Sequence, residues 1–262
     1  MSATTSSDAI AARFADLKRR ERSGLVVYLT AGHPSPNESL ALLRAVATAG
    51  ADVIEVGVPF SDPMADGPVI QQSSQTALAH GMTVNGALEL IRRAQLEIPI
   101  VLFSYLNPLL AAGTDILDRA AAAGAHGVLV TDLPVGADPE RERWFGEGPL
   151  AFVRLVAPTT PTDRMREIAA HGGGFVYLIS RTGVTGEQRD ISADLAPTIE
   201  RLRSVTTLPI CVGFGISTPE QARAVGRLAD GVVVGSAVVR EAGTSVERAA
   251  EIVRHMRQAL DA

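Results

Sequence analysis

Residues 51–71 read ADVIEVGVPFSDPMADGPVIQ, an apolar run followed at once by a loop rich in proline and glycine. The apolar run carries one acid in its middle, Glu55, and the loop holds two more, Asp62 and Asp66. A carboxylate is costly to bury because its charged form loses its hydration. We therefore expect a strand that keeps such a group to use it, although a buried ion pair is the alternative explanation.

Similar apolar runs recur along the chain, with helical segments between them. Most are continuous and rich in β-branched residues, as expected for parallel strands buried on both faces. The predicted strands are 25–30, 52–57, 99–104, 127–131, 150–156, 175–179, 209–213 and 231–235, and the predicted helices are 37–48, 84–96, 115–123, 161–170, 193–204, 219–227 and 246–260. This alternation, without a linker or a shift in composition, predicts an α/β chain that forms one (β/α)8 TIM barrel domain over residues 1–262, with an open doubly wound sheet as the alternative.

Two segments exceed this minimal plan. Residues 8–22 predict an extra helix before the first strand, suited to closing the bottom of the barrel. Residues 69–80 add a helical piece after the second strand. The loop after that strand is therefore elaborate, and barrels keep their chemistry in the loops at the carboxyl ends of their strands.

The second strand is expected to turn Glu55 into the barrel. Side chains alternate along a strand, so Val53, Glu55 and Gly57 share one side and Ile54 and Val56 share the other. The helix-facing side should be apolar, which leaves Glu55 inside, near the mouth. Desolvation there would raise its pKa and suit it to general acid or base catalysis near neutral pH.

Asp66 is the second candidate catalytic group. Prolines and glycines restrict its loop, and a carboxylate held over the mouth could stabilise a positive charge or accept a hydrogen bond from a substrate N–H. An Asx-turn or a helix N-cap is the alternative role. Asp62, in the sequence Ser-Asp-Pro, is interpreted as a turn former or an interface residue.

Glycine-rich loops follow the last three predicted strands. They read RTGVTG at 181–186, GFGIS at 213–217 and Gly-Ser at 235–236. Barrels often bind phosphate with the loops after strands seven and eight, where bare backbone N–H groups can approach an anion. Tight turns also favour glycine, but the joint position of the loops predicts a phosphorylated small substrate.

Aromatic and apolar side chains at strand ends are candidates for the pocket wall. Tyr177 lies inside the sixth strand and could face a ligand or pack in the core. Four others could line an apolar pocket or equally be core residues: Tyr28, Phe103, Leu129 and Phe214. No HExxH, CxxC or similar ligand spacing is present, so no metal site is predicted.

Composition argues against several functional classes. The net charge is −5 and the pI about 5.6, and the sequence has no cluster of Lys and Arg dense enough to bind nucleic acid or an anionic membrane. The only cysteine, Cys211, lies in an apolar run and is interpreted as a small buried hydrophobe. The first residues lack the pattern of a signal peptide, and no run of 18 apolar residues occurs. We expect a cytoplasmic protein.

At residues 55–71, EVGVPFSDPMADGPVIQ, the chain closely resembles the signature of the tryptophan synthase alpha subunit family. The resemblance covers nearly the whole sequence and extends to YLTAGHP at 28–34, RTGVTG at 181–186, GFGIS at 213–217 and GSA at 235–237. It implies a (β/α)8 barrel lyase that cleaves indole-3-glycerol phosphate to indole and glyceraldehyde 3-phosphate by a retro-aldol reaction. It also implies no cofactor in this subunit and a beta subunit, in an alpha2beta2 tetramer, that uses pyridoxal phosphate to join indole to serine.

The resemblance assigns roles position by position. Glu55 matches the acid/base glutamate and Asp66 the catalytic aspartate. The family's substrate-binding tyrosine corresponds to Tyr177, and Thr185 corresponds to a threonine that contacts the catalytic aspartate. The positions matching the phosphate site are Gly186, Gly215, Gly235 and Ser236, and those matching the loop that meets the beta subunit are Pro59 and Asp62.

Three other functions are alternatives. Another phosphate-binding barrel of the same pathway would commonly use a catalytic lysine, but Lys18, in the N-terminal helix, is the lysine that we find. A non-catalytic barrel that only activates a partner is disfavoured by intact Glu55 and Asp66. A free-standing lyase that releases indole without a beta subunit is also compatible with the sequence.

Overall fold

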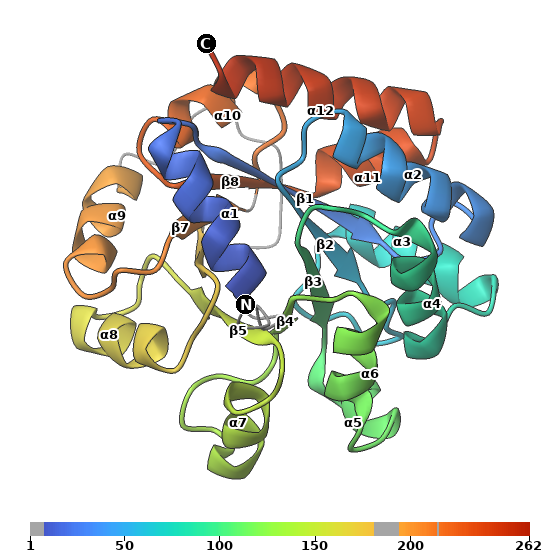
Figure 1. Cartoon of the computed structure of the whole chain (residues 1–262), viewed down its shortest axis with the longest axis horizontal. Helices are drawn as coiled ribbons and strands as arrows, with labels where there is room; N and C mark the ends of the chain where they lie inside the picture. The colour runs from blue at the N-terminus through green and yellow to red at the C-terminus, as the bar shows by residue number, and fades with distance from the viewer. Residues whose placement is uncertain (1–7, 181–193, 214) are drawn as a thin grey trace, which may run out of the picture.

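The computed structural model describes residues 8–180, 194–213 and 215–262. Eight parallel strands form a closed barrel in the order β1 to β8, and β8 pairs with β1. Figure 1 shows the helices surrounding this barrel. The strands are β1 (Gly24–Thr30), β2 (Val53–Gly57), β3 (Ile100–Ser104), β4 (Gly127–Val130), β5 (Ala151–Val156), β6 (Val176–Ile179), β7 (Ile210–Gly213) and β8 (Gly231–Val234). The predicted (β/α)8 barrel is confirmed, and the pairing of β8 with β1 rules out the open sheet.

The helices also lie close to their predicted positions. They are α1 (Asp8–Arg19), α2 (Pro36–Thr48), α3 (Pro68–Ala79), α4 (Val84–Ala94), α5 (Leu106–Ala111), α6 (Ile116–Ala123), α7 (Pro139–Gly146), α8 (Thr162–Ala170), α9 (Leu195–Arg203), α10 (Pro219–Gly226), α11 (Ser236–Ala242) and α12 (Val246–Leu260). The helix before β1 ends at Arg19 and not at Arg22, because Glu21 adopts a left-handed backbone conformation with φ of 53°. Helices α5 and α7 were not predicted.

The two larger apolar cores lie inside the barrel and between the barrel and its helices. The inner core fills the barrel with side chains from its strands, among them Val26, Val53, Val101 and Cys211. The outer core lies between strands and helices and contains Ile54 and Val56. The alternation predicted along β2 is therefore confirmed, and so is the burial of Cys211, which is a free cysteine.

Helix α1 closes the lower end of the barrel, as predicted. In Figure 1 it crosses the near end of the strands. Its Ile10, Phe14 and Leu17 belong to the inner core. Glycine at the start of two strands makes room for them, since a Cβ on Gly24 would lie 2.9 Å from Phe14 Cε1 and one on Gly127 would lie 2.8 Å from Ile10 Cδ1.

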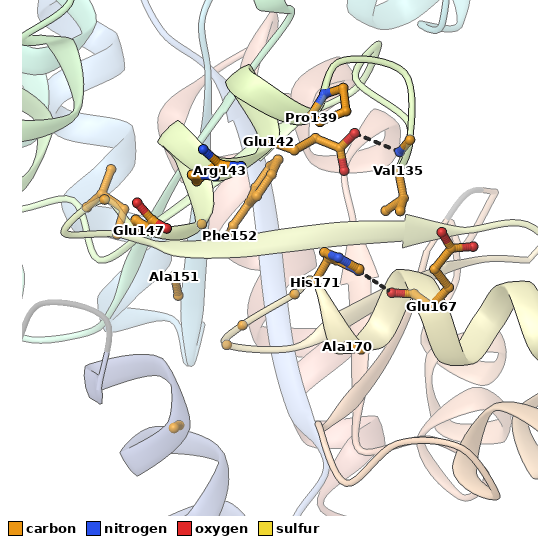
Figure 2. A pocket seen from close by; sticks show the side chains of 18 of the residues that line it. Val135, Pro139, Glu142, Arg143, Glu147, Ala151, Phe152, Glu167, Ala170 and His171 are labelled. Carbon is orange, nitrogen blue, oxygen red and sulfur yellow. Dashed lines mark hydrogen bonds between the residues drawn. The ribbon is translucent and has the colours of Figure 1, made fainter.

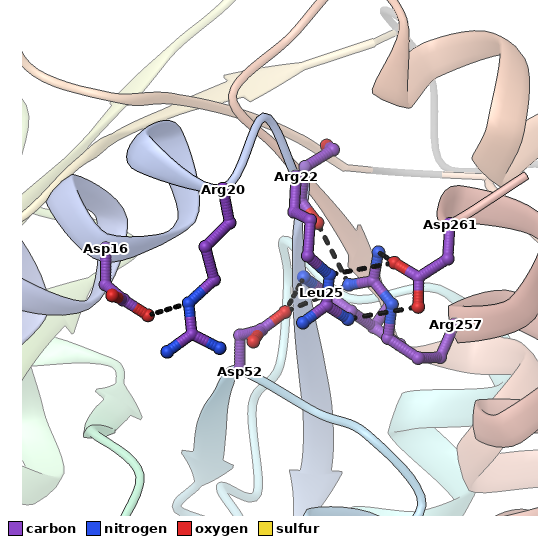
Figure 3. Close-up of polar contacts among 8 residues, drawn as sticks. Asp16, Arg20, Arg22, Leu25, Asp52, Arg257 and Asp261 are labelled. Atoms are coloured by element: carbon purple, nitrogen blue, oxygen red, sulfur yellow. Dashed lines mark hydrogen bonds and ion pairs between the residues drawn. The ribbon is translucent and has the colours of Figure 1, made fainter.

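A buried ion pair fastens α12 to the same end of the barrel (Figure 3). Asp52, just before β2, accepts hydrogen bonds from Leu25 N at 2.9 Å and from Arg257 Nη1 at 3.0 Å. Arg257 also donates to the Ser23 carbonyl and pairs with Asp261. Asp52 is thus a structural acid that joins the start of β1 and β2 to α12 at the lower end of the barrel. None of the helices in the described ranges is long and apolar enough to cross a membrane.

Candidate active site

Glu55 occupies the third position of β2 and faces the barrel interior. It lies in register between Tyr28 of β1 and Val101 of β3, and only 1% of its surface is exposed. Within the described part of the chain, its Oε1 has no hydrogen-bond partner. Burial raises the pKa of this carboxyl to about 8. The side chain is therefore mostly protonated at neutral pH, as a general acid must be. The structure does not support the alternative of a buried ion pair for Glu55.

At the barrel mouth, two tyrosine side chains pack against glycines of the neighbouring strands. A Cβ on Gly57, two residues beyond Glu55, would lie 2.1 Å from the Tyr28 hydroxyl oxygen. The same distance separates a Cβ on Gly213, at the end of β7, from the Tyr177 hydroxyl oxygen. Each ring therefore takes the space that a side chain on the next strand would fill. This arrangement places two phenol groups beside the acid.

Asp66 lies in the loop between β2 and α3, close enough to Tyr28 for its charge to act on the tyrosine hydroxyl. Its Oδ2 accepts a hydrogen bond of 3.2 Å from the Tyr105 hydroxyl, whose oxygen in turn accepts one of 2.9 Å from Ala65 N. Burial raises the pKa of Asp66 to about 6, and the hydrogen bond from Tyr105 opposes that rise. The N-cap of α3 is Gly67, so the alternative role of Asp66 as a helix cap is wrong. The Asp66 carboxylate therefore caps no N–H group of α3.

Tyr105 is a site residue that sequence reasoning missed. It follows β3 directly and is buried, with its ring 5.1 Å from that of Phe60 in the Asp66 loop. An aromatic residue at the carboxyl end of a barrel strand was the available signal. Its hydroxyl partner could not be inferred, because Asp66 lies 39 residues away in the sequence.

Electrostatic effects show that these groups lie together. The charges of Asp66 and Glu55 both raise the pKa of the Tyr28 hydroxyl, and they also raise that of Tyr177. Burial is the larger cause for each tyrosine. Both phenols stay protonated near neutral pH and offer neutral hydroxyls around the two acids. The structure thus brings Glu55, Asp66, Tyr28 and Tyr177 into one site.

The predicted phosphate-binding glycines lie after adjacent strands, β7 and β8. Gly215 has a left-handed backbone with φ of +84°, and a Cβ there would meet nothing within 4 Å. Gly235 is the N-cap of α11 and provides no side-chain cap for its first N–H groups, and Ser236 begins that helix exposed. Open backbone at this place suits an anion. Thr185, Gly186 and Phe214 lie outside the described residues.

The other predicted residues occupy distinct places. Phe103 packs edge-on against Tyr28 with ring centroids 5.1 Å apart. Leu129 is opposite Phe103 in register and is fully buried in the inner core. Asp62 is exposed and accepts a hydrogen bond of 2.5 Å from the Ser61 hydroxyl, whereas Pro59 is buried. Met64, between Asp62 and Asp66, is 82% exposed.

A cavity of about 770 Å³ lies elsewhere, on the flank of the barrel between α7 and α8 (Figure 2). None of the predicted site residues line it. Its buried acid, Glu142, already pairs with Arg154 at 2.7 Å and accepts a hydrogen bond from Gly136 N. The acid held between these helices is therefore committed to an ion pair, unlike Glu55 at the barrel mouth. The described ranges also hold no group of three or more His, Cys, Asp or Glu residues that could bind a metal ion.

A closed barrel with a buried, protonated glutamate and a second carboxylate at the carboxyl ends of its strands defines an enzyme of the acid–base type. The model of the family "Tryptophan synthase alpha chain" matches residues 14–261. A tryptophan synthase alpha chain from Desulfatibacillum aliphaticivorans is 49% identical over 231 residues, which cover 87% of each chain. One from Caulobacter vibrioides is 46% identical over 250 residues, which cover 94% of this chain and 89% of the relative.

Solved structures agree with the sequence comparison. The tryptophan synthase subunit alpha of Legionella pneumophila superposes with a TM-score of 0.88 at 34% identity and covers 99% of both chains. A chain in a structure of Mycobacterium tuberculosis tryptophan synthase gives a TM-score of 0.89 at 31% identity over 96% of this chain and 97% of that one. The chain belongs to the tryptophan synthase alpha chain family, the lyase subunit that cleaves indole-3-glycerol phosphate. In that family the alpha subunit needs no cofactor, and pyridoxal phosphate sits in the beta subunit.

Proposed function

We propose that Glu55 and Asp66 carry out the acid–base chemistry of indole-3-glycerol phosphate cleavage in this chain. The observation that carries the proposal is the state of Glu55: fully buried, facing the barrel mouth, without a partner for Oε1 in the described residues, and with a pKa of about 8. Such a group holds a proton at neutral pH and can donate it to a substrate.

The reaction requires a proton at carbon 3 of the indole ring before the side chain can leave. Glu55 donates that proton, which leaves a positive charge spread over the ring and its nitrogen. Asp66, ionised above its pKa of about 6, accepts the ring N–H and stabilises this charge. The glutamate, now a carboxylate, takes the proton of the glycerol hydroxyl next to the ring as the carbon–carbon bond breaks. Indole and glyceraldehyde 3-phosphate are released, and Glu55 is protonated again.

The remaining predicted residues bind the two ends of the substrate. Gly215, Gly235 and Ser236 hold the phosphate with backbone N–H groups, with Thr185 and Gly186 as further predicted contacts. The indole ring lies among the apolar and aromatic residues at the mouth: Tyr28, Phe103, Leu129, Tyr177 and Phe214. Binding energy from the phosphate, remote from the reacting carbon, fixes the orientation of the ring.

We further propose that the chain works as one domain beside a beta subunit, in an alpha2beta2 tetramer that passes indole through an internal tunnel. The relatives support this proposal, because the Mycobacterium tuberculosis chain is part of a structure named tryptophan synthase. The exposed Met64 beside Asp62 supplies an apolar contact on the loop that carries Asp66. A cytoplasmic location fits the single cysteine, which is buried and free.

Indole release tests the proposal. Glu55→Gln should abolish indole formation while the fold persists, and Asp66→Asn should strongly reduce turnover while phosphate binding remains. Wild-type turnover in Glu55→Gln would remove the general acid role, and equal losses of turnover and phosphate affinity in Asp66→Asn would make that residue structural. The same assay with and without a beta subunit, together with size-exclusion chromatography of the mixture, distinguishes a complex from a free-standing lyase.

A further inference from the structure

Tyr28 lies between the two halves of the proposed site. Its backbone is in register with Glu55, and its hydroxyl reaches the space above Gly57 on the acid side. Its other end touches the phosphate side, because a Cβ on Gly235 would lie 3.3 Å from Tyr28 Cβ and 3.5 Å from Cδ1. A substrate that spans from the acids to Gly235 must pass this side chain. The part of indole-3-glycerol phosphate that does so is the hydroxylated chain between the ring and the phosphate.

The ring of Tyr28 is held in place by packing. Phe103 lies edge-on to it at an interplanar angle of 79°, and Ile70 of α3 and Val239 of α11 complete the cluster. Only 8% of the residue is exposed. The position of its hydroxyl is thus fixed before a substrate arrives, which lowers the entropy cost of a hydrogen bond made there.

Buried hydroxyls lie beside the Tyr28 side chain. Ser73 donates a hydrogen bond of 2.8 Å to the Ile70 carbonyl, and its Oγ lies 2.7 Å from Thr30 Oγ1. Thr30 is in turn a neighbour of the Tyr28 hydroxyl, and this contact lowers the pKa of the hydroxyl against the larger, opposite effect of burial. Because a phenol hydroxyl can both donate and accept, Tyr28 keeps the capacity to bond a ligand hydroxyl as well.

We propose that Tyr28 determines specificity for a hydroxylated side chain: its hydroxyl forms a hydrogen bond with a hydroxyl of the glycerol phosphate chain. The carboxyl groups of Glu55 and Asp66 act on the transferred proton and on the ring N–H, whereas Tyr28 stays neutral and takes no part in the proton transfer. The inference rests on the proposed function, because it takes the acids and Gly235 as the two ends of the site.

The test compares two ligands in a background that does not turn over. Glu55→Gln and the double variant Glu55→Gln/Tyr28→Phe are titrated by calorimetry with indole-3-glycerol phosphate and with indole-3-propanol phosphate, which keeps the ring and phosphate but lacks both chain hydroxyls. Loss of one neutral hydrogen bond should weaken binding of the first ligand by about 5- to 10-fold. Binding of the second should change by less than about 2-fold, since no hydroxyl is present to lose a partner.

Phe103→Leu, in the same Glu55→Gln background, is the matched control because it disturbs the pocket wall and keeps the Tyr28 hydroxyl. It should weaken both ligands by the same factor. Equal effects of Tyr28→Phe on the two ligands, or no effect on either, would overturn the proposal. Cleavage of indole-3-glycerol phosphate by Glu55→Gln would instead refute the proposed function, so the two failures are distinguishable.

Discussion

Replacing Glu55 by Gln should stabilise this protein while it destroys activity. The wild-type carboxyl has a pKa of about 8 in the folded chain and 4.5 as a model group, because burial removes water from its charged form. Between these two values the folded state binds more protons than the unfolded state. The free energy of unfolding therefore falls as pH rises through this window. Glutamine has nearly the same shape and cannot ionise, so the variant escapes this loss.

The size of the effect follows from the two pKa values. Integrating proton binding between 4.5 and about 8 gives a penalty on the wild type of ~1 kcal/mol at pH 5, ~3 kcal/mol at pH 7 and ~5 kcal/mol at pH 9. Burying the amide of glutamine adds an offset that does not depend on pH. The pH dependence is unaffected by this offset: the stability of the variant relative to the wild type should grow by ~4 kcal/mol from pH 5 to pH 9.

Urea unfolding of both proteins at pH 5, 7 and 9, followed by circular dichroism, measures this difference. Glu97→Gln is the matched control, because Glu97 is an exposed acid in the turn after α4 and its variant should follow the wild-type curve. A stability difference between Glu55→Gln and the wild type that stays constant across this range would refute the reasoning. It would mean that the Glu55 carboxyl has the same pKa in the folded and unfolded chains.

Three further predictions concern the acids and their partners. The rate of indole release should be bell-shaped in pH, falling below pH ~6 as Asp66 is protonated and above pH ~8 as Glu55 loses its proton. Tyr105→Phe removes the hydrogen bond that opposes the raised pKa of Asp66, so the acidic limb of that profile should move to higher pH. Arg257→Met leaves the buried Asp52 without its cation and should cost ~3–5 kcal/mol of unfolding free energy in urea.

Each of these predictions has its own control and contrary result. A rate of indole release that does not change between pH 5 and 9 would refute the roles proposed for Glu55 and Asp66. Phe60→Leu disturbs the ring contact of Tyr105 without removing its hydroxyl, so an equal shift of the acidic limb in both variants would make Tyr105 a packing residue only. Arg254→Met changes an exposed arginine of the same helix, and matching losses in the two arginine variants would exclude the ion pair as the cause.

Much of the fold could be predicted because each barrel strand is buried on both faces. Continuous β-branched runs such as the one in β8 are a local signal, and the alternation along β2 was enough to turn Glu55 inward. Helix α7 was not predicted because it is polar and buries only Phe145, so its sequence has no apolar periodicity. Helix α5 was not predicted because it has only six residues and contains Pro108.

The sequence was enough to predict the acids of the candidate site, but it did not predict their hydrogen-bond partners. Glu55 and Asp66 stand out locally, as charges within or beside an apolar strand. The roles of Tyr105 and of the Thr30–Ser73 pair depend on contacts across 39 and 43 residues of sequence. Alternation along a strand gives the face of a side chain, but the partner on another element is fixed only by the closure of the barrel. Sequence patterns therefore predict the reactive groups better than they predict the residues that position those groups.

Two acids, one just before β2 and one in its middle, show what decides the role of a charge in a buried segment. Asp52 and Glu55 lie three residues apart, and both are almost fully buried. Asp52 receives a backbone N–H and the guanidinium of Arg257, so removing the cation should cost stability. Glu55 Oε1 receives no hydrogen bond from the described residues, so removing its charge should add stability. Burial alone does not distinguish a structural acid from one that is available for proton transfer; the presence of a partner does, and for Asp52 that partner is 205 residues away.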